Sequence, residues 1–537
     1  MRFHIPSKVN VVRSSQSKFG TDNGDFENYE NSRSAREFPE TAMTNQVDET
    51  PQVNTAESEI AQFFSGRKVL VTGGLGFLGK LLIEKLLRSC PNIATLYVFV
   101  RRKDGKSPRE RVHQLAEMPL YERLKGEQPD FLQKLTVIES DLDTTNLGLS
   151  PQDRNRLLDT NVIFHGTTII RSNQKLRTMA NVHVQTTKQI LLLAKEMSDL
   201  KAFVHVSTVF AHSAIKSIEE RHYPPPMETD QLLSLLNVLN DRKLEAIAPA
   251  LIGNWPNTFA FTKAIAEGTV LRYGGGIPAC IVRPSVVTST WKEPIVGWAD
   301  SVYGPVGLLA GSSLGLLRTI HCHTDKKLDF VPADYVTSCL IAAAWHTNVR
   351  NVKKDFKVDV DTGIVPDVER IPVYNCVSSC QRPITWRTFR KHVRDHGSRI
   401  PGARNVRLQC MFWNSRLWMH KILMCLFHLL PAIVMDTAAV LTGRNPRWCK
   451  TYNLIHAHLS ATSYFTTQQW HFKNNATVKL WERMCAVDRE IFEFDMSNFD
   501  WVEYVKRMAR GIRTFVVGKI TTWDAVVKEG LAEYVEL

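Results

Sequence analysis

The sequence predicts an α/β protein, with a Rossmann-type doubly wound parallel sheet followed by a mainly helical C-terminal domain. Short apolar strands alternate with helical stretches from residue 67 to about residue 283. A glycine-rich loop separates the first strand from the first helix, and beyond about residue 370 long helical stretches rich in Trp, Phe, Arg and Lys take over. Strands that alternate with helices in this way form a parallel sheet with right-handed crossovers.

The strands are predicted from short apolar runs, and the helices from apolar residues at helical spacing. The predicted strands are Arg67–Thr72, Thr95–Val100, Leu135–Glu139, Val162–His165, Ala202–Ser207 and Ala279–Arg283. The predicted helices among them are Phe77–Ser89, Gln152–Asp159, Val182–Glu196 and Phe261–Arg272. The segment Arg221–Asp230, rich in Pro, Glu and Asp, interrupts the alternation as a loop over the carboxyl edge of the sheet.

A chain of 537 residues is too long for one typical core, so we expect two domains and a tail. The predicted divisions are a disordered leader (1–60), a dinucleotide-binding reductase domain (61–370), a helical C-terminal domain (371–515) and a C-terminal tail (516–537). The ten cysteines are scattered. The nearest pair, Cys376 and Cys380, has no second Cys pair or His pair at zinc spacing. Reduced thiols are therefore expected, and no metal site is predicted.

The net charge of +13 is unevenly placed. Residues 1–60 hold six Lys/Arg and ten Asp/Glu, so the rest of the chain carries +17. A basic body suits an anionic membrane surface or a polyanionic substrate such as a coenzyme A thioester. Nucleic acid is not expected as a partner, because no Lys/Arg stripe is interleaved with stacking aromatic residues.

The glycine loop Thr72–Gly79 follows a strand and opens a helix, a context typical of a dinucleotide-binding fingerprint. Gly73 allows the tight turn, Gly76 lets the backbone approach a pyrophosphate, and Gly79 lets helix and strand pack closely. The helix N-terminus offers N–H groups and a positive dipole end to the phosphates. The predicted cofactor-binding residues of the loop are Thr72, Gly73, Gly76, Phe77, Leu78 and Gly79.

The end of the second strand indicates which cofactor is bound. NAD-binding proteins usually carry an acid there, which holds the ribose 2′-hydroxyl. This chain has Arg101 and Arg102 instead, which would hold a 2′-phosphate by charge-assisted hydrogen bonds. We therefore predict NADPH, with a solvated run of charge as the alternative. Asp141, just past the third strand, is predicted to meet the adenine.

A Ser-Thr pair after the fifth strand, Ser207-Thr208, and Lys263 in a later helix resemble the extended short-chain dehydrogenase/reductase family. In that family a Tyr lies four residues before the Lys, so both face the nicotinamide. The resemblance implies that Lys263 binds the cofactor ribose and is catalytic, together with Ser207 and Thr208. For Ser207, a buried strand-end hydroxyl with no catalytic role is the alternative.

Longer motifs give a closer match. They are Asn257–Ala264 (NTFAFTKA), Val282–Ser285 (VRPS), Trp291–Pro294 (WKEP), Gly304–Gly307 (GPVG), Phe330–Asp334 (FVPAD) and His428–Ala432 (HLLPA). In this order and at these intervals, over residues 65–515, they resemble the alcohol-forming fatty acyl-CoA reductases. The resemblance implies reduction of a long-chain acyl-CoA by two NADPH, through an aldehyde, to a primary alcohol.

One position departs from that family. Phe259 occupies the place of the catalytic Tyr, and it has no hydroxyl to donate a proton or to hold the carbonyl oxygen. Loss of one oxyanion donor typically costs roughly 10²–10³ in rate. The alternative to an active enzyme is therefore a relative that binds NADPH and acyl-CoA without efficient turnover. A steroid dehydrogenase or a sugar-nucleotide epimerase is disfavoured, because neither group is expected to carry the WKEP motif with this C-terminal domain.

Arg283 and Ser285 are predicted to line the nicotinamide and substrate side, with a structural role as the alternative. His165 and His205, at strand ends, are expected to be core or cofactor-edge residues rather than metal ligands.

An uncharged run of fourteen residues lies between Lys421 and Asp436. It falls short of the ~20 residues that span a bilayer. A buried helix and a membrane-dipping hairpin flanked by Arg416, Lys421 and Arg444 both fit it. The family resemblance suggests association with the cytosolic face of endoplasmic reticulum, peroxisomes or lipid droplets. The C-terminus shows neither a peroxisomal Ser-Lys-Leu ending nor an obvious tail anchor.

Overall fold

The computed structural model describes residues 57–518, apart from 104, 142–143, 170–173, 301–303, 355–370 and 398–410. Most of the predicted leader (1–60) and of the predicted tail (516–537) therefore lies outside the described residues. The last residues of the predicted leader are ordered, because helix α1 (Glu59–Phe64) begins within them and Ile60 is buried.

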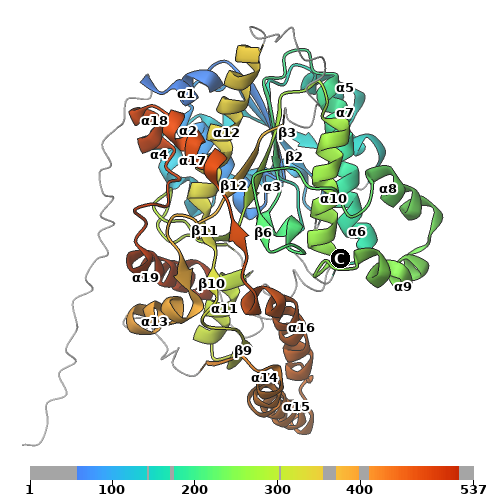
Figure 1. Ribbon diagram of the computed structural model, residues 1–537, viewed down its shortest axis with the longest axis vertical. Helices are drawn as coiled ribbons and strands as arrows, with labels where there is room; N and C mark the ends of the chain where they lie inside the picture. Colours follow the sequence, from blue (N-terminus) through green and yellow to red (C-terminus); the bar gives the residue numbers. More distant parts are fainter. Residues whose placement is uncertain are drawn as a thin grey trace, which may run out of the picture. The chain divides into compact units, whose positions relative to one another are not determined.

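A parallel sheet forms the centre of the fold (Figure 1). Its seven strands lie in the order β12-β7-β5-β4-β1-β2-β3. The order reverses beside β1, which is the topology of a doubly wound dinucleotide-binding sheet. The strands are β1 (Lys68–Thr72), β2 (Thr95–Val100), β3 (Leu135–Glu139), β4 (Val162–His165), β5 (Ala202–Val206), β7 (Ala279–Pro284) and β12 (Val373–Cys376). The predicted fold class is confirmed, and the six predicted strands are present.

Helices cover both faces of the sheet, because alternate side chains of each buried strand point to opposite sides. Val69 and Val71 of β1 pack in one core with α2 (Phe77–Ser89) and α12 (Ala333–Lys354). Leu70 packs in a second core. That second core holds α7 (Thr186–Lys195) and the end of α10 (Thr258–Tyr273). Figure 1 shows α2 and α12 on one side of the sheet and α7 and α10 on the other.

The remaining helices of the N-terminal two thirds are α1 (Glu59–Phe64), α3 (Pro108–Ala116), α4 (Glu122–Glu127), α5 (Pro151–Leu157), α6 (Leu176–Ala180), α8 (Thr229–Val238), α9 (Asp241–Ile252) and α11 (Gly304–Ser313). A π-helical turn, Asn181–Gln185, joins α6 to α7. The predicted loop over residues 221–230 is largely present, since α8 begins at Thr229.

The C-terminal part is mainly helical and is tied to the rest by short strands. Its helices are α13 (Trp386–Gly397), α14 (Leu417–Met424), α15 (Leu430–Leu441), α16 (Trp448–Thr467), α17 (Asn475–Arg483), α18 (Ala486–Ile491) and α19 (Trp501–Gly511). The short strands are β6 (Ser217–Ile218), β8 (Val286–Thr288), β9 (Thr319–His321), β10 (Lys327–Leu328), β11 (Phe330–Pro332), β13 (Ile384–Thr385), β14 (Phe412–Asn414) and β15 (His471–Phe472). Strand β14 pairs with β9, and β15 with β6.

Strand β12 lies beyond residue 370, where the sequence places a domain boundary, yet it pairs with β7 at the edge of the central sheet. The described residues between 57 and 518 belong to one compact unit. The C-terminal part therefore completes the sheet of the reductase part, and a boundary at residue 370 divides that sheet.

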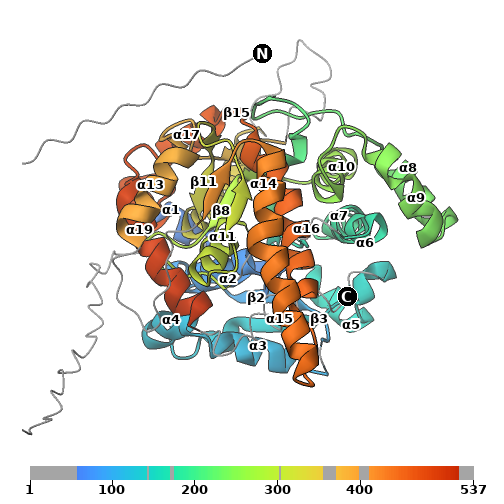
Figure 2. The same cartoon turned by 90° about the horizontal axis from the view of Figure 1, so that it is seen from below.

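Helices α14 and α15, joined by a π-helical turn, form one continuous helix from Leu417 to Leu441 (Figure 2). By length and composition this helix could cross a membrane, and only 11% of its most apolar window is buried. Its buried residues are His420, His428 and Ala432, so the polar histidines face the protein and the apolar side chains face outward. The buried-helix interpretation of this segment is therefore wrong.

Candidate active site

The glycine loop has the geometry that a bound pyrophosphate requires. Gly73 has a φ of +72°, a conformation that side chains rarely adopt. A Cβ on Gly79 would lie 2.2 Å from the carbonyl oxygen of Gly73, so only glycine lets α2 pack this closely on the loop. No side chain caps the N-terminus of α2 at Gly76, which leaves its first N–H groups for a ligand.

The loop opens into a cavity of about 760 Å³. All six predicted loop residues line it, as do the predicted residues Ser207, Thr208, Phe259, Lys263 and Ser285. The cavity continues beyond them to an aromatic arm in the C-terminal part, lined by Trp386, Phe465, Trp470 and Phe472. One cavity therefore joins the dinucleotide loop to an apolar arm, passing Lys263.

The cofactor end of the cavity carries more positive charge than the sequence predicts. Arg101 lines it, together with Lys103, which precedes α3, and Arg111, which lies in the first turns of α3. Arg102 does not line it. The guanidinium of Arg102 donates instead to the carboxylate of Glu139 at the end of β3. Asp141 also lines this end, next to the loop.

Lys263 is fixed by the start of α10. The side chain of Asn257 caps this helix by accepting from the Ala260 N–H at 2.9 Å. Lys263 follows one turn later, buried, and its ammonium donates to the carbonyl of Val206 at 3.0 Å. Burial lowers the pKa of Lys263 to about 8. Phe259 lies one turn earlier on the cavity wall, with its ring edge-on to His183 at 5.5 Å between centroids.

The two predicted hydroxyls beside Lys263 already donate to other groups. Ser207 donates its proton to the buried carboxylate of Glu267, and Thr208 donates to the carbonyl of Pro284 at 3.1 Å. Neither hydroxyl donates into the cavity in this arrangement.

Arg283 does not line the cavity. It is fully buried, and its guanidinium donates to both carboxylate oxygens of Glu267. Burial alone would raise the pKa of Glu267, but Arg283 and His212 outweigh that effect and hold the pKa well below its usual range. The alternative interpretation of Arg283, a structural role, fits this position: it holds the carboxylate that positions Ser207.

Ser285, in contrast, lines the cavity as predicted for the substrate side. Its hydroxyl oxygen is buried and has no hydrogen-bond partner among the described residues. The same is true of Thr167 on the opposite loop, which also lines the cavity. Both hydroxyls are available to a ligand.

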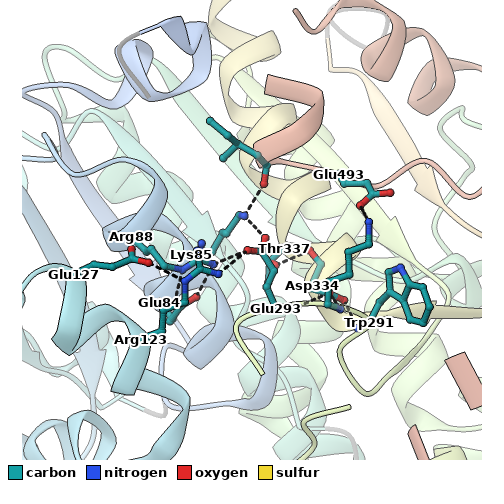
Figure 3. Close-up of polar contacts among 12 residues, drawn as sticks. Glu84, Lys85, Arg88, Arg123, Glu127, Trp291, Glu293, Asp334, Thr337 and Glu493 are labelled. Atoms are coloured by element: carbon teal, nitrogen blue, oxygen red, sulfur yellow. Dashed lines mark hydrogen bonds and ion pairs between the residues drawn. The ribbon is translucent and has the colours of Figure 1, made fainter. Parts of the chain in front are cut away.

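The Trp-Lys-Glu-Pro motif lies outside the cavity. It contacts helix α2, which follows the glycine loop (Figure 3). The carboxylate of Asp334 accepts the backbone N–H groups of Trp291 at 2.8 Å and of Lys292 at 2.7 Å. This holds Glu293 so that its carboxylate pairs with Lys85 and Arg88 of α2. The motif therefore has a structural role, which is to fix α2 and with it the phosphate-binding loop.

The strand-end histidines are buried in the core. His165 bonds to the hydroxyls of Thr72 at 2.8 Å and of Thr187 at 2.9 Å, and burial lowers its pKa to about 3. His205 has no hydrogen-bond partner for either ring nitrogen among the described residues. Within the described part of the chain, no group of three His, Cys, Asp or Glu side chains is placed to hold a metal ion.

Comparison with known proteins agrees with this architecture. Residues 71–340 match an NAD-binding family profile described as male sterility protein, and residues 427–519 match a second profile with the same description. The chain is 36% identical to fatty acyl-CoA reductase 1 of Xenopus laevis over 461 residues, which cover 86% of each chain. The human protein of the same name is also 36% identical, over the same share of each chain.

The chain belongs to the fatty acyl-CoA reductase family. The family resemblance seen in the sequence motifs is thereby confirmed, and the protein is an oxidoreductase with a nicotinamide cofactor. A more distant relative in the same family is the Drosophila melanogaster fatty acyl-CoA reductase wat, 34% identical over 86% of each chain.

Solved structures support the fold of this reductase. The reductase domain of a non-ribosomal peptide synthetase from Mycobacterium tuberculosis superposes with a TM-score of 0.53 at 14% identity, covering 86% of this chain and 98% of that one. The terminal reductase domain of the myxalamid pathway gives a TM-score of 0.52 at 17% identity, covering 85% and 93%.

Several residues of this reductase's site could not be found by motif matching. Glu267 follows Lys263 by four residues, so helical spacing alone places both on one face of α10 and could have indicated it. Arg111 and Thr168 carry no such signal, because their positions depend on how α3 and the loop after β4 fold back over the cofactor loop.

Proposed function

We propose that this protein reduces long-chain fatty acyl-CoA to a primary fatty alcohol with NADPH. Membership of the fatty acyl-CoA reductase family supports the reaction. The observation that carries the proposal is the single cavity that runs from the dinucleotide loop, past Lys263, into an aromatic arm. A cofactor and an apolar chain bound in such a cavity would meet at Lys263.

NADPH is favoured over NADH by the charge at the ribose end. Arg101, Lys103 and Arg111 line it, and they complement a 2′-phosphate. The N-terminus of α2 would hold the pyrophosphate, and Lys263 would donate to the nicotinamide ribose. Two molecules of NADPH, bound one after the other, would each supply one hydride, and with two protons these convert the thioester to an alcohol and free the CoA thiol.

The apolar arm suits the acyl chain. The ring of Phe465 lies 5.3 Å from that of Phe210 and 5.9 Å from that of Trp470. The rings of such a cluster offer a broad apolar surface, which favours an alkyl chain over a sugar or a nucleotide. Ser285, with its unpartnered hydroxyl, lies on the wall where the thioester would enter.

A second function remains a candidate because of Phe259. The ring keeps its place on the cavity wall but cannot donate to the substrate oxygen. A catalytically impaired relative that binds NADPH and acyl-CoA would have this same cavity.

We further propose that the outward apolar face of the helix Leu417–Leu441 lies against a membrane. Large apolar side chains along it are about half exposed, among them Trp418, Leu426, Leu430 and Val434. A patch of this extent is typical of a membrane or protein contact. The cytosolic face of endoplasmic reticulum, peroxisomes or lipid droplets is the proposed place.

The test is an assay of purified protein with NADPH and a series of acyl-CoA chain lengths, run beside Phe259→Tyr. We expect the wild type to produce fatty alcohol. A silent wild type together with an active Tyr variant would establish the impaired relative instead. If both bind NADPH and neither reduces any acyl-CoA, the proposed substrate is wrong.

A further inference from the structure

A hydrogen-bonded chain of side chains lies behind the cavity wall, next to Phe259. The hydroxyl of Thr168, which lines the cavity, is 3.0 Å from Nε2 of His183. Nδ1 of His183 is 2.8 Å from the hydroxyl of Thr262. His183 lies in the π-helical turn Asn181–Gln185, and such turns occur frequently at functional sites.

The protons in this chain can be assigned by accounting for each donor. Thr262 donates its single hydroxyl proton to the carbonyl of Thr258 at 2.8 Å, so its oxygen accepts from Nδ1–H of His183. Nε2 of His183 must then accept, and the Thr168 hydroxyl donates to it. Burial, followed by the charge of Lys263, lowers the pKa of His183 well below its usual value, so the ring is neutral.

The chain has a second arrangement with the same number of protons. If Thr262 turns its proton to Nδ1, then Nε2 carries the ring proton and donates it to the oxygen of Thr168. The Thr168 hydroxyl is then free to donate into the cavity. The Thr258 carbonyl lies at the start of α10, where the helical ladder offers it a backbone N–H four residues later.

We propose that Thr168, oriented by His183, donates the hydrogen bond to the substrate carbonyl oxygen that a hydroxyl at position 259 would otherwise supply. Ser207 and Thr208 cannot fill this role without giving up their bonds to Glu267 and Pro284. Ser285 and Thr167 have no hydrogen-bond partner among the described residues, so none of these residues orients their hydroxyls. Oriented donors stabilise an oxyanion most, because they need no reorganisation during the reaction.

This inference rests on the proposed function and predicts that the wild type turns over. The test measures kcat/KM for palmitoyl-CoA and the NADPH dissociation constant in the wild type, Thr168→Val, Phe259→Tyr and the double variant. Thr168→Val should lose roughly 10²–10³ in kcat/KM, the cost of one oxyanion donor, with NADPH affinity unchanged. In the Phe259→Tyr background the same change should cost less than tenfold, because the Tyr hydroxyl replaces the donor.

His183 is a positioning residue in this proposal, so His183→Leu should lower kcat/KM in the wild type but add little once Thr168 is Val. A purely structural role would add its loss in both backgrounds. Thr229→Val is the matched control for loss of a buried hydroxyl pair, because Thr229 bonds to Thr269 at 2.8 Å away from the cavity. It should leave kcat/KM unchanged.

Several results would overturn the proposal. One is a Thr168→Val protein within a few-fold of wild type, and another is an equal loss in both backgrounds. The third is a large loss in Ser285→Ala or Thr167→Val with none in Thr168→Val. A silent wild type with an active Phe259→Tyr would also overturn it and leave the substrate assignment intact, whereas silence in both variants would refute the proposed function as well.

Discussion

Lys263 and Phe259 occupy neighbouring turns of α10, and both line the cavity. Of these two, only Lys263 has a polar group that can bind a ligand. Lys263 keeps its charge buried beside the carbonyl of Val206, where a cofactor ribose would lie. Phe259 keeps only the shape of the ring. The hydroxyl chemistry therefore falls to residues on other elements, and Thr168 with His183 is the pair that the hydrogen bonds point to.

The pKa of Lys263, lowered by burial to about 8, predicts a pH dependence. The ammonium is present below that pH and is lost above it. NADPH affinity, and with it kcat/KM, should therefore fall as the pH rises through about 8, because kcat/KM reports groups of the free enzyme. Lys263→Met should bind NADPH weakly without this fall. Wild-type affinity that stays constant from pH 7 to pH 9.5 would contradict the assignment.

Arg101 and Arg102 are adjacent in sequence but differ in surroundings, which separates their roles. Arg101 lines the cavity, whereas Arg102 pairs with Glu139 outside it. Arg101→Ala should weaken NADPH roughly 10- to 100-fold, the worth of a hydrogen bond to a charged group, and weaken NADH little. Arg102→Ala is the matched control and should have the smaller effect. Titration of both cofactors by fluorescence measures this, and equal losses for NADPH and NADH would refute the NADPH preference.

At the scale of elements, helix α2 is held from two sides. Its N-terminus meets the glycine loop, and its buried side chains Lys85 and Arg88 pair with Glu293. Burial alone would raise the pKa of Glu293, but those two cations lower it to about 2. The Trp-Lys-Glu-Pro motif thus stabilises the position of α2 and has no catalytic role.

Glu293→Gln should destabilise the protein, because it leaves the buried Lys85 without its ion-pair partner and leaves Arg88 with Glu84 alone. Breaking a buried ion pair from one side costs about 3–5 kcal/mol. Urea denaturation followed by tryptophan fluorescence at pH 7 measures the loss. Glu503→Gln, which breaks partly exposed pairs with Lys506 and Arg507, is the control and should cost less than about 1 kcal/mol. Similar losses of stability in both variants would contradict this role of Glu293.

In the helix Leu417–Leu441 the usual distribution of a surface helix is reversed. Its histidines face the protein, and its apolar side chains face outward. His420 bonds to Thr319 and His428 accepts the backbone N–H of Arg318, so the inner face is satisfied by hydrogen bonds. This arrangement needs an apolar partner on its outer face, which supports the proposed membrane contact.

Changing Leu430 and Val434 together to Asp should abolish co-flotation with anionic phospholipid vesicles, because both side chains are more than half exposed on the outer face. Val238→Asp on α8, at an exposed apolar site outside this helix, is the control and should float like the wild type. Unchanged flotation of the double variant would place the membrane contact elsewhere.

At the scale of the whole molecule, the sequence predicts what depends on local pattern. The six strands and the glycine loop follow from periodicity and spacing, and the structure contains them. The significance of Phe259 comes from the family resemblance, which places a Tyr at that position. The hydrogen bonds that Ser207 and Arg283 donate to Glu267 do not follow from the local sequence pattern. These three residues meet only when α10 packs beside β5 and β7. Likewise, the place of β12 at the edge of the central sheet does not follow from local pattern, because it depends on pairing with β7, which is distant in sequence.

The orientation of the helix Leu417–Leu441 also depends on tertiary structure. Its composition fits a buried core helix equally well, and only the docking of His420 and His428 onto β9 and its neighbour Arg318 turns the apolar face outward.

The central claim, that this cavity brings a nicotinamide cofactor and an acyl thioester together for reduction, is tested most directly by following the transferred hydride. Purified wild type is incubated with palmitoyl-CoA and NADPH that carries two deuterium atoms at C4 of the nicotinamide, and the products are analysed by mass spectrometry. We expect a primary alcohol with two deuterium atoms on C1. Deuterium absent from every product, while NADPH is shown to bind, would contradict it.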